Sequence, residues 1–171
     1  MKITKRTRVK DITPLIRNEE TMKRLIESFP PYPLEKNILS MTIGEFCELT
    51  IDESGYINRM LDQKQKAYIA FGRLKEYSNQ MKALTKFLEG MQIKMSNEEK
   101  QASTGIDMPS TAERILLDTV KAYHLHSTKE AEQLPITDWI LVLKDSVATA
   151  KYSRNYQKIL EAKSKMKSKR K

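Results

Sequence analysis

The chain has 171 residues, of which 39% are hydrophobic and 31% are charged, with a formal net charge of +9. Only 5 Gly and 6 Pro are present, which argues against a turn-rich β fold, so we expect one all-α domain built as a helical bundle. The single cysteine, Cys47, excludes an intrachain disulfide and a cysteine-based zinc site. No run approaches the ~18 apolar residues of a membrane span, so no membrane partner is expected.

Positive charge is concentrated at the two ends. Residues 1–10 and 161–171 each sum to +5, which leaves −1 for the remaining 150 residues. We therefore predict a basic N-terminal arm (1–12), extended or a short strand, a helical domain (13–160) and a basic C-terminal tail (161–171). The N-terminus has no apolar segment behind its cations and is not a secretory signal. An intracellular location is expected.

The segment before residue 50 is predicted to contain two helices. Thr13 and Pro14 have the chemistry of a helix start, and that helix has to end before Pro30-Pro31. Thr42 and Glu45 have capping-box spacing, which predicts a short helix over 43–49.

Residues 52–92 are predicted to form one long amphipathic helix around which the bundle is organised. Apolar residues recur every seven positions in two sets offset by three, which makes an a/d seam. Forty helical residues would extend roughly 60 Å, so the seam needs a partner. Helices of the same chain and other subunits are both expected to cover it, and the half near Met91 is expected to be the more exposed. The partner-binding candidates are Leu74, Tyr77, Met81, Leu84, Leu88, Met91 and Trp139.

After residue 92 the periodicity weakens, and 96–110 is predicted to be a mobile segment. Ser110 and Glu113 predict a helix start, and Ser127 and Glu130 predict another. Thr137 is predicted to cap the last helix. That helix would carry Ile140, Leu143, Val147, Ala150 and Tyr156 on one side, before a disordered tail that alternates Lys with Ser.

No residue pattern supports catalysis, a metal or a cofactor. His124 and His126 are two apart, so on a helix they lie on different faces. Cys47 is expected in the core, and the isolated glycines form no phosphate-binding loop. We therefore expect a protein that is not an enzyme.

The basic ends admit three interpretations: a solubilising segment, an arm that contacts nucleic acid phosphates, or an arm laid on an acidic neighbouring subunit. No aromatic residue lies in 161–171, which argues against base stacking there. The candidates for such contacts are Lys5, Arg6, Arg8, Lys163, Lys165, Lys167, Lys169, Arg170 and Lys171.

Two stretches, 39–49 (LSMTIGEFCEL) and 131–139 (AEQLPITDW), resemble small helical accessory proteins of tailed bacteriophages. The similarity is to tail-assembly chaperones and to head–tail or tail structural proteins from phages of gut Bacteroidota. It implies a non-catalytic assembly or virion role, as a homo-oligomer or as part of a larger assembly. The alternative is a nucleic-acid-binding protein that uses its basic ends.

Overall fold

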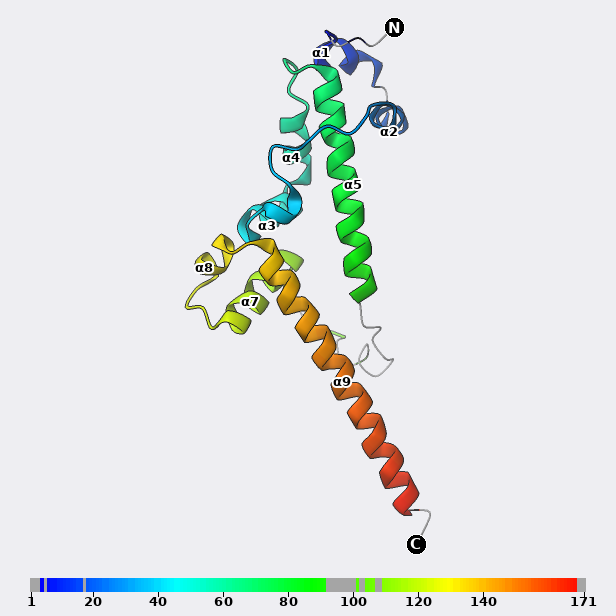
Figure 1. Cartoon of the computed structure of the whole chain (residues 1–171), viewed down its shortest axis with the longest axis vertical. Coiled ribbons are helices and arrows are strands. Elements are labelled where there is room, and N and C mark those ends of the chain that lie inside the picture. Colours follow the sequence, from blue (N-terminus) through cyan, green and yellow to red (C-terminus); the bar gives the residue numbers. More distant parts are fainter. Residues whose placement is uncertain are drawn as a thin grey trace.

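The computed structural model describes residues 4, 6–16, 18–91, 101, 104–106 and 109–168. Its elements are all helical, which confirms the predicted all-α class (Figure 1). In chain order they are α1 (Val9–Ile12), η1 (Thr13–Leu15), α2 (Glu19–Ser28), η2 (Ile38–Ser40), α3 (Ile43–Ile51), α4 (Glu53–Met60), α5 (Ala67–Met91), α7 (Thr111–Tyr123), α8 (Thr128–Gln133) and α9 (Ile136–Ser168).

The prediction of one helix over 52–92 is wrong in its first half. Asp52 separates α3 from α4 and caps α4, because its side chain accepts a hydrogen bond from the Gly55 amide. A turn then separates α4 from α5, and Asp62 stabilises it by accepting from the Lys64 amide at 2.9 Å. The polar Gln63, which interrupts the apolar seam, lies in this turn. The long central helix therefore starts at Ala67 and ends at Met91.

The N-terminal arm is docked rather than free from Thr7 onward. The Val9 amide donates to the Gln65 carbonyl at 3.0 Å, and the Ala67 amide donates to the Thr7 carbonyl at 2.8 Å. Val9 and Ile12 are buried within a short helix, not a strand. The predicted helix start at Thr13 yields only the single turn η1, and α2 begins later, after Asn18.

The extended, proline-rich segment 30–33, which we call the proline strap, crosses α5 at Gly72. The Tyr32 amide donates to the Gly72 carbonyl at 3.0 Å. A Cβ on Gly72 would lie 2.7 Å from the Tyr32 Cβ and 2.9 Å from the Pro30 carbonyl oxygen, so only glycine leaves room for the strap. Directly before the strap, Phe29 stacks on Phe71 with ring centroids 5.4 Å apart. These contacts hold α2 and the strap against α5.

The helices α1, α2, α4 and α5 form a first group. A second group packs beside it, in which α3, α7 and α8 surround the start of α9 (Figure 1). The Ile136 amide donates to the Met41 carbonyl at 3.0 Å, and the Ile43 amide donates to the Leu134 carbonyl at 2.8 Å. The last helix thus begins at Ile136, so the prediction that Thr137 caps it is wrong. The helix starts predicted at Ser110 and Ser127 are confirmed, since both hydroxyls accept from a backbone amide three residues on.

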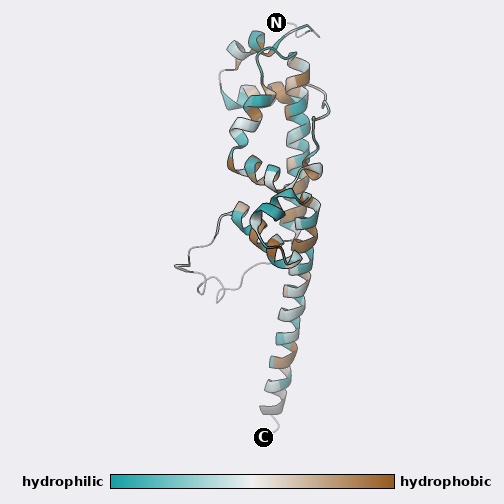
Figure 2. Cartoon of the chain, turned by 90° about the vertical axis from the view of Figure 1, so that its left-hand side faces the viewer, coloured by the Kyte–Doolittle hydropathy of each residue, from teal (hydrophilic) through white to brown (hydrophobic). Residues whose placement is uncertain are grey.

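The C-terminal half of α9 projects away from the body (Figures 1 and 2). The helix continues to Ser168, so the prediction of a disordered tail, which covers residues 163–171, is wrong for residues 163–168. Between 151 and 165 every side chain except that of Arg154 is exposed. The 33 residues of α9 correspond to about 50 Å of helix, and the part of the chain that the structure describes does not bury residues 151–165 apart from Arg154.

Candidate protein-interaction surfaces

The first candidate surface is a groove between α2 and α5, which we call the α2–α5 groove. Its apolar lining includes Met22, Ile26, Leu74, Tyr77 and Met81, and Lys82, Lys86 and Glu89 contribute charge. The Tyr77 hydroxyl donates to the Glu53 carboxylate at 2.9 Å. Burial, and then the acceptor Glu53, raise the pKa of Tyr77, which therefore stays a neutral hydrogen-bond donor.

The second surface lies on the other side of α5, and we call it the η2–α9 groove. It is lined by Ile38, Leu39, Leu84, Phe87 and Ile140, with little polar surface. Leu39 and Phe87 are themselves exposed. The Lys144 ammonium of α9 lies 5.2 Å from the Phe87 ring centroid, a cation–π contact that joins α9 to α5 beside the groove.

The two stretches that carried the bacteriophage resemblance pack against each other. Thr42 and Pro135 form an antiparallel bridge, and Phe46 stacks on Trp139 with centroids 6.4 Å apart. Gly44 lies so close to α8 that an added Cβ would be 3.1 Å from the Glu132 carbonyl oxygen. Residues 39–49 and 131–139 are therefore one structural unit, which joins the two groups of helices.

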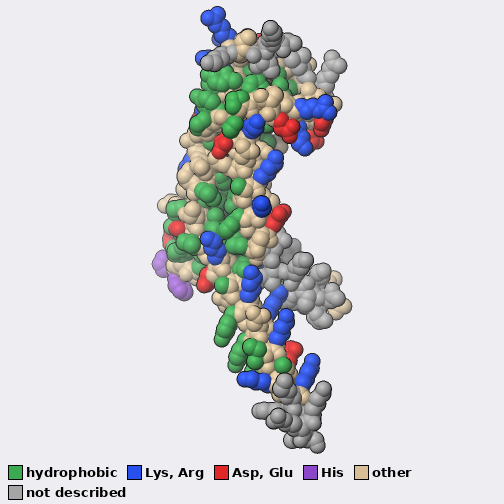
Figure 3. Space-filling model, turned by 45° about the vertical axis from the view of Figure 1, so that its right-hand side comes forward, with side chains coloured by type: hydrophobic (Ala, Val, Ile, Leu, Met, Phe, Trp, Pro, Cys, Tyr) green, Lys and Arg blue, Asp and Glu red, His purple; other side chains and the backbone are tan. Residues whose placement is uncertain are grey.

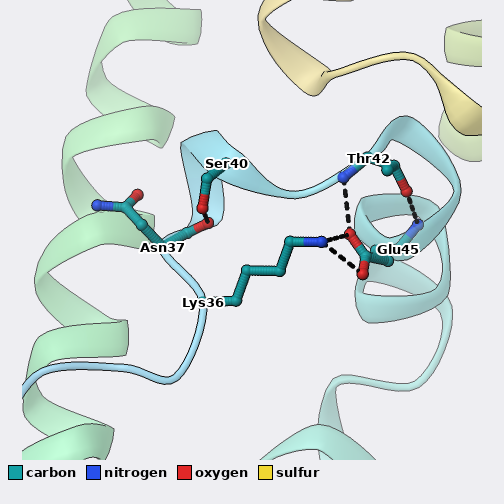
Figure 4. A network of polar contacts seen from close by, with 5 residues as sticks. All are labelled: Lys36, Asn37, Ser40, Thr42 and Glu45. Atoms are coloured by element: carbon teal, nitrogen blue, oxygen red, sulfur yellow. Dashed lines mark hydrogen bonds and ion pairs between the residues drawn. The ribbon is translucent and has the colours of Figure 1, made fainter.

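A polar network fixes the start of α3 in this unit (Figure 4). The Thr42 hydroxyl accepts from the Glu45 amide, and the Glu45 carboxylate accepts from the Thr42 amide at 2.7 Å, which confirms the predicted capping box. Lys36 donates to the same carboxylate at 2.7 Å. The Lys36 hydrogen bond, followed by that of the Thr42 amide, lowers the pKa of Glu45.

The third surface is the outer face of α9. Large apolar side chains are exposed along it, and we call them the α9 stripe: Leu141, Tyr152, Tyr156, Ile159 and Leu160. Tyr152 is the most exposed of the five at 70%, and its ring stacks on that of Tyr156 with centroids 6.2 Å apart. Figure 3 shows such apolar side chains on the projecting helix, between lysines and arginines.

The α9 stripe lies opposite the face that α9 uses for the core. Ile136, Trp139 and Ile140 are buried. At about 100° per residue, Tyr152 and Tyr156 are on the other side of the helix. The prediction that Tyr156 shares a side with Ile140 is therefore wrong. The two residues are 16 positions apart, which at about 100° each is four full turns plus nearly half a turn.

The predicted partner-binding residues divide into two sets. Leu74, Tyr77, Leu84 and Trp139 are buried in the core of the single chain, so their main contacts are intramolecular. Three of the four also contribute an edge to a groove, because Leu74 and Tyr77 line the α2–α5 groove and Leu84 lines the η2–α9 groove.

The other candidates, Met81, Leu88 and Met91, are half-buried. Leu88, Met91 and Trp139 line a further hollow together with α7 and α9. Since most of the buried residues of α5 lie before Tyr77, the expectation that the half near Met91 is more exposed is confirmed.

The basic candidates do not form one surface. Arg6, Arg8, Lys163 and Lys165 are exposed, and Lys167 lies in the last turn of α9. Lys5, Lys169, Arg170 and Lys171 fall outside the described residues, as does most of the predicted mobile segment 96–110. Because α1 and the end of α9 lie at opposite ends of the molecule (Figure 1), the described basic residues of the two ends lie far apart.

The candidate chemical groups do not assemble into a site. Cys47 is buried, its Sγ is 3.7 Å from the Ala112 carbonyl oxygen, and burial raises the pKa of its thiol. His124 ends α7 in the left-handed conformation with φ 53°, and both it and His126 are exposed. Within the described ranges, no three His, Cys, Asp or Glu side chains are grouped to hold a metal ion. None of the helices described there is both long and apolar enough to cross a bilayer.

Sequence reasoning missed the α9 stripe. Its signal was present, because Tyr152, Tyr156 and Ile159 are spaced by four and then three residues. The lysines that lie among these residues favour the interpretation of a charged surface instead. Comparison adds no relative: no family model matches the chain, and no curated protein or solved structure is similar to it.

Proposed function

We propose that the protein is a non-catalytic structural or assembly subunit that works by binding other protein subunits. The observation that carries this proposal is the projecting half of α9, which exposes the large apolar side chains of the α9 stripe. Large apolar side chains exposed next to one another on a helix, as Tyr152, Tyr156 and Ile159 are, are typical of protein interfaces. The open grooves on both sides of α5 add further apolar surface of the same kind.

The bacteriophage setting, as a virion component or an assembly factor, belongs to the same proposal. It rests on the resemblance of residues 39–49 and 131–139, and an intracellular or virion location follows from it. A host-cell enzyme would need a cluster of reactive groups, and the described titratable residues offer none that we would assign to catalysis.

The test is the molar mass of the full chain by light scattering after size exclusion, with the 260/280 nm absorbance ratio followed with and without nuclease and high salt. A defined oligomer free of nucleic acid is the expected result. A paired variant, Leu39→Ser with Phe87→Ser, removes the exposed apolar side chains of the η2–α9 groove while leaving the core untouched. Monomers that carry nucleic acid until salt removes it would overturn the proposal.

A second candidate function, nucleic-acid binding, is favoured by one specific observation. Lys144, Lys151, Lys158 and Lys165 follow each other at intervals of seven along α9. Since seven residues are nearly two helical turns, these ammonium groups form one row, spaced by about 10 Å along the helix. Such a row can contact phosphates without sequence choice, and its affinity would fall steeply with salt. Replacing Lys151 and Lys158 by Gln would reduce that salt dependence.

A further inference from the structure

Three residues of the α9 stripe, Tyr152, Tyr156 and Ile159, fit the a and d positions of a heptad repeat. With position d at Asp145, Tyr152 and Ile159, position a falls at Val142, Thr149, Tyr156 and Lys163. The centre of this seam carries the large apolar side chains of Tyr152, Tyr156 and Ile159. Asp145 bounds it on the N-terminal side, and Lys163 bounds it on the C-terminal side. Apart from the half-buried Val142, these side chains are exposed, so the seam has no cover within the described part of the chain.

The bounding charges determine which orientation of a second copy fits. In a parallel pair each residue meets its own equivalent, so Asp145 would face Asp145 and Lys163 would face Lys163, which is repulsive at both ends. In an antiparallel pair centred near residue 154, Asp145 faces Lys163 of the second copy, and Lys163 faces the second copy's Asp145. The same register places Tyr152 against Tyr156, so the aromatic rings meet, and places Ile159 against Thr149, whose methyl group it can contact.

The flanking positions support close approach of two helices. Small or uncharged polar residues stand at positions e and g beside the apolar centre, so no like charges meet there. These residues are Ser146, Ala148, Ser153, Asn155 and Ala162. Leu160, also at a flank and exposed, extends the apolar contact. The lysine row at 144, 151, 158 and 165 occupies position c, on the side of the helix away from the seam.

The placement of α9 leaves this seam accessible. The core contacts of the helix use the opposite face, through Ile136, Trp139 and Ile140. Overlap of residues 142–166 in two copies corresponds to about 37 Å of paired helix. A two-fold axis near residue 154 makes the contact isologous, so it closes as a dimer and does not propagate.

We propose that the α9 stripe pairs with the α9 stripe of a second copy of this chain, antiparallel, with Asp145 and Lys163 of the two copies facing each other. This inference rests on the proposed function, because it names one of the subunits that the protein binds. It predicts a species of twice the 19.9 kDa chain mass.

Cysteine cross-linking tests the orientation. Thr149→Cys and Ile159→Cys are both made on exposed positions of the full chain, and the wild-type chain with its buried Cys47 is the control. In the antiparallel pair, equivalent positions are separated by about 15 Å along the helices, beyond the reach of a disulfide. The mixture of the two variants should therefore cross-link on mild oxidation, while each variant alone should not. Cross-linking of each variant with itself would overturn the antiparallel pairing.

Charge reversal tests the register independently of the cysteines. Asp145→Lys and Lys163→Asp alone should each weaken dimerisation at least tenfold, and the double variant should recover most of that loss. Lys158→Asp, an exposed change on the same helix but off the seam, is the matched control and should leave the dimer intact. Circular dichroism would verify that all variants stay helical. Failure of the double variant to recover the dimer would overturn the inference.

The outcomes separate this inference from the proposed function. If the wild-type chain forms an oligomer that the α9 variants leave intact and that Leu39→Ser with Phe87→Ser disrupts, self-pairing through α9 is overturned and the assembly role stands. If the wild-type chain is a monomer at tens of micromolar, self-pairing is likewise overturned. Binding of nucleic acid by that monomer would then overturn the assembly role as well.

Discussion

The two long helices, α5 and α9, differ in how the chain uses them. α5 has 25 residues, and its first half is covered by α1, α2, α4 and the proline strap. α9 has 33 residues, but it is buried only near its start, and its side chains from Lys151 to Lys165 are exposed apart from that of Arg154. Both helices are rich in residues of high helix propensity, such as Leu, Ala and Lys. One long helix therefore organises the fold, while the other carries exposed apolar side chains away from the body.

The largest effect on stability is expected at the centre of α5. Phe71 is fully buried and stacks on Phe29. Phe71→Ala should lower the free energy of unfolding by about 3–5 kcal/mol, because it removes a large apolar contact and leaves a cavity. Urea denaturation followed by circular dichroism measures this. Tyr152→Ala on α9, compared at a protein concentration at which both chains are monomeric, is the matched aromatic control, with an expected change within ~0.5 kcal/mol. Equal losses in both variants would contradict the division between the helices.

A smaller effect is expected where the strap crosses α5. Gly72→Ala should lower the free energy of unfolding by about 1–3 kcal/mol, because the added Cβ collides with Tyr32 and the Pro30 carbonyl. Gly90→Ala, in the same helix with nothing within 4 Å of the added Cβ, is the control. It should instead stabilise by up to ~1 kcal/mol, through better helix propensity. Thermal melts of both variants give the comparison, and a neutral Gly72→Ala would show that the strap moves freely.

The junction between the two groups of helices should show a modest pH dependence. Lys36 and the Thr42 amide hold the pKa of Glu45 below its ordinary value of 4.5. Because the ionised carboxylate is the form that these contacts stabilise, their contribution to the free energy of unfolding is present above about pH 4.5. It is lost as the pH falls through the lower pKa of the folded state. Since the ion pair is exposed, the effect should stay below ~1 kcal/mol. Lys36→Met should flatten stability between pH 5 and about pH 3, and an unchanged profile would contradict this assignment.

The smallest effect on the folded monomer is expected from deleting residues 151–171. Of these residues, 151–165 contribute little buried surface, so the free energy of unfolding should change by less than ~1 kcal/mol. The same deletion should abolish the self-association inferred for the α9 stripe. Denaturation and light scattering on one sample measure both quantities. A large loss of stability would show that the projecting half of α9 supports the body after all.

Local signals predicted much of this fold. The capping boxes at Thr42 and Ser110 start helices where expected, and the α5 seam buries Leu74, Tyr77 and Leu84. The boundary of the central helix was not predicted, although Gln63 interrupts the seam, because periodicity continues across a turn that Asp62 makes. The burial of Val9 and Ile12 was missed for a different reason: their neighbours come from residues 63–67.

The candidate surfaces depended on tertiary structure to a greater extent. Leu84 and Trp139 were proposed for partners, yet both are mainly core, because helices distant in sequence cover them. Tyr152 and Ile159 were overlooked, yet they are exposed on a helix that projects. A stripe of apolar residues has the same pattern whether a neighbour in the same chain or another molecule covers it. Only the packing of the chain distinguishes the two cases.

The amino-acid sequence by itself determined the all-α class, the caps of α3, α7 and α8, and the concentration of positive charge at the ends, because these follow from local composition and spacing. Tertiary structure decided that residues 39–49 and 131–139 form one unit, that Gly72 makes room for the strap, and that α9 leaves the body. Those features arise from contacts between segments far apart in the chain, and the free energy of such contacts depends on where every other segment lies.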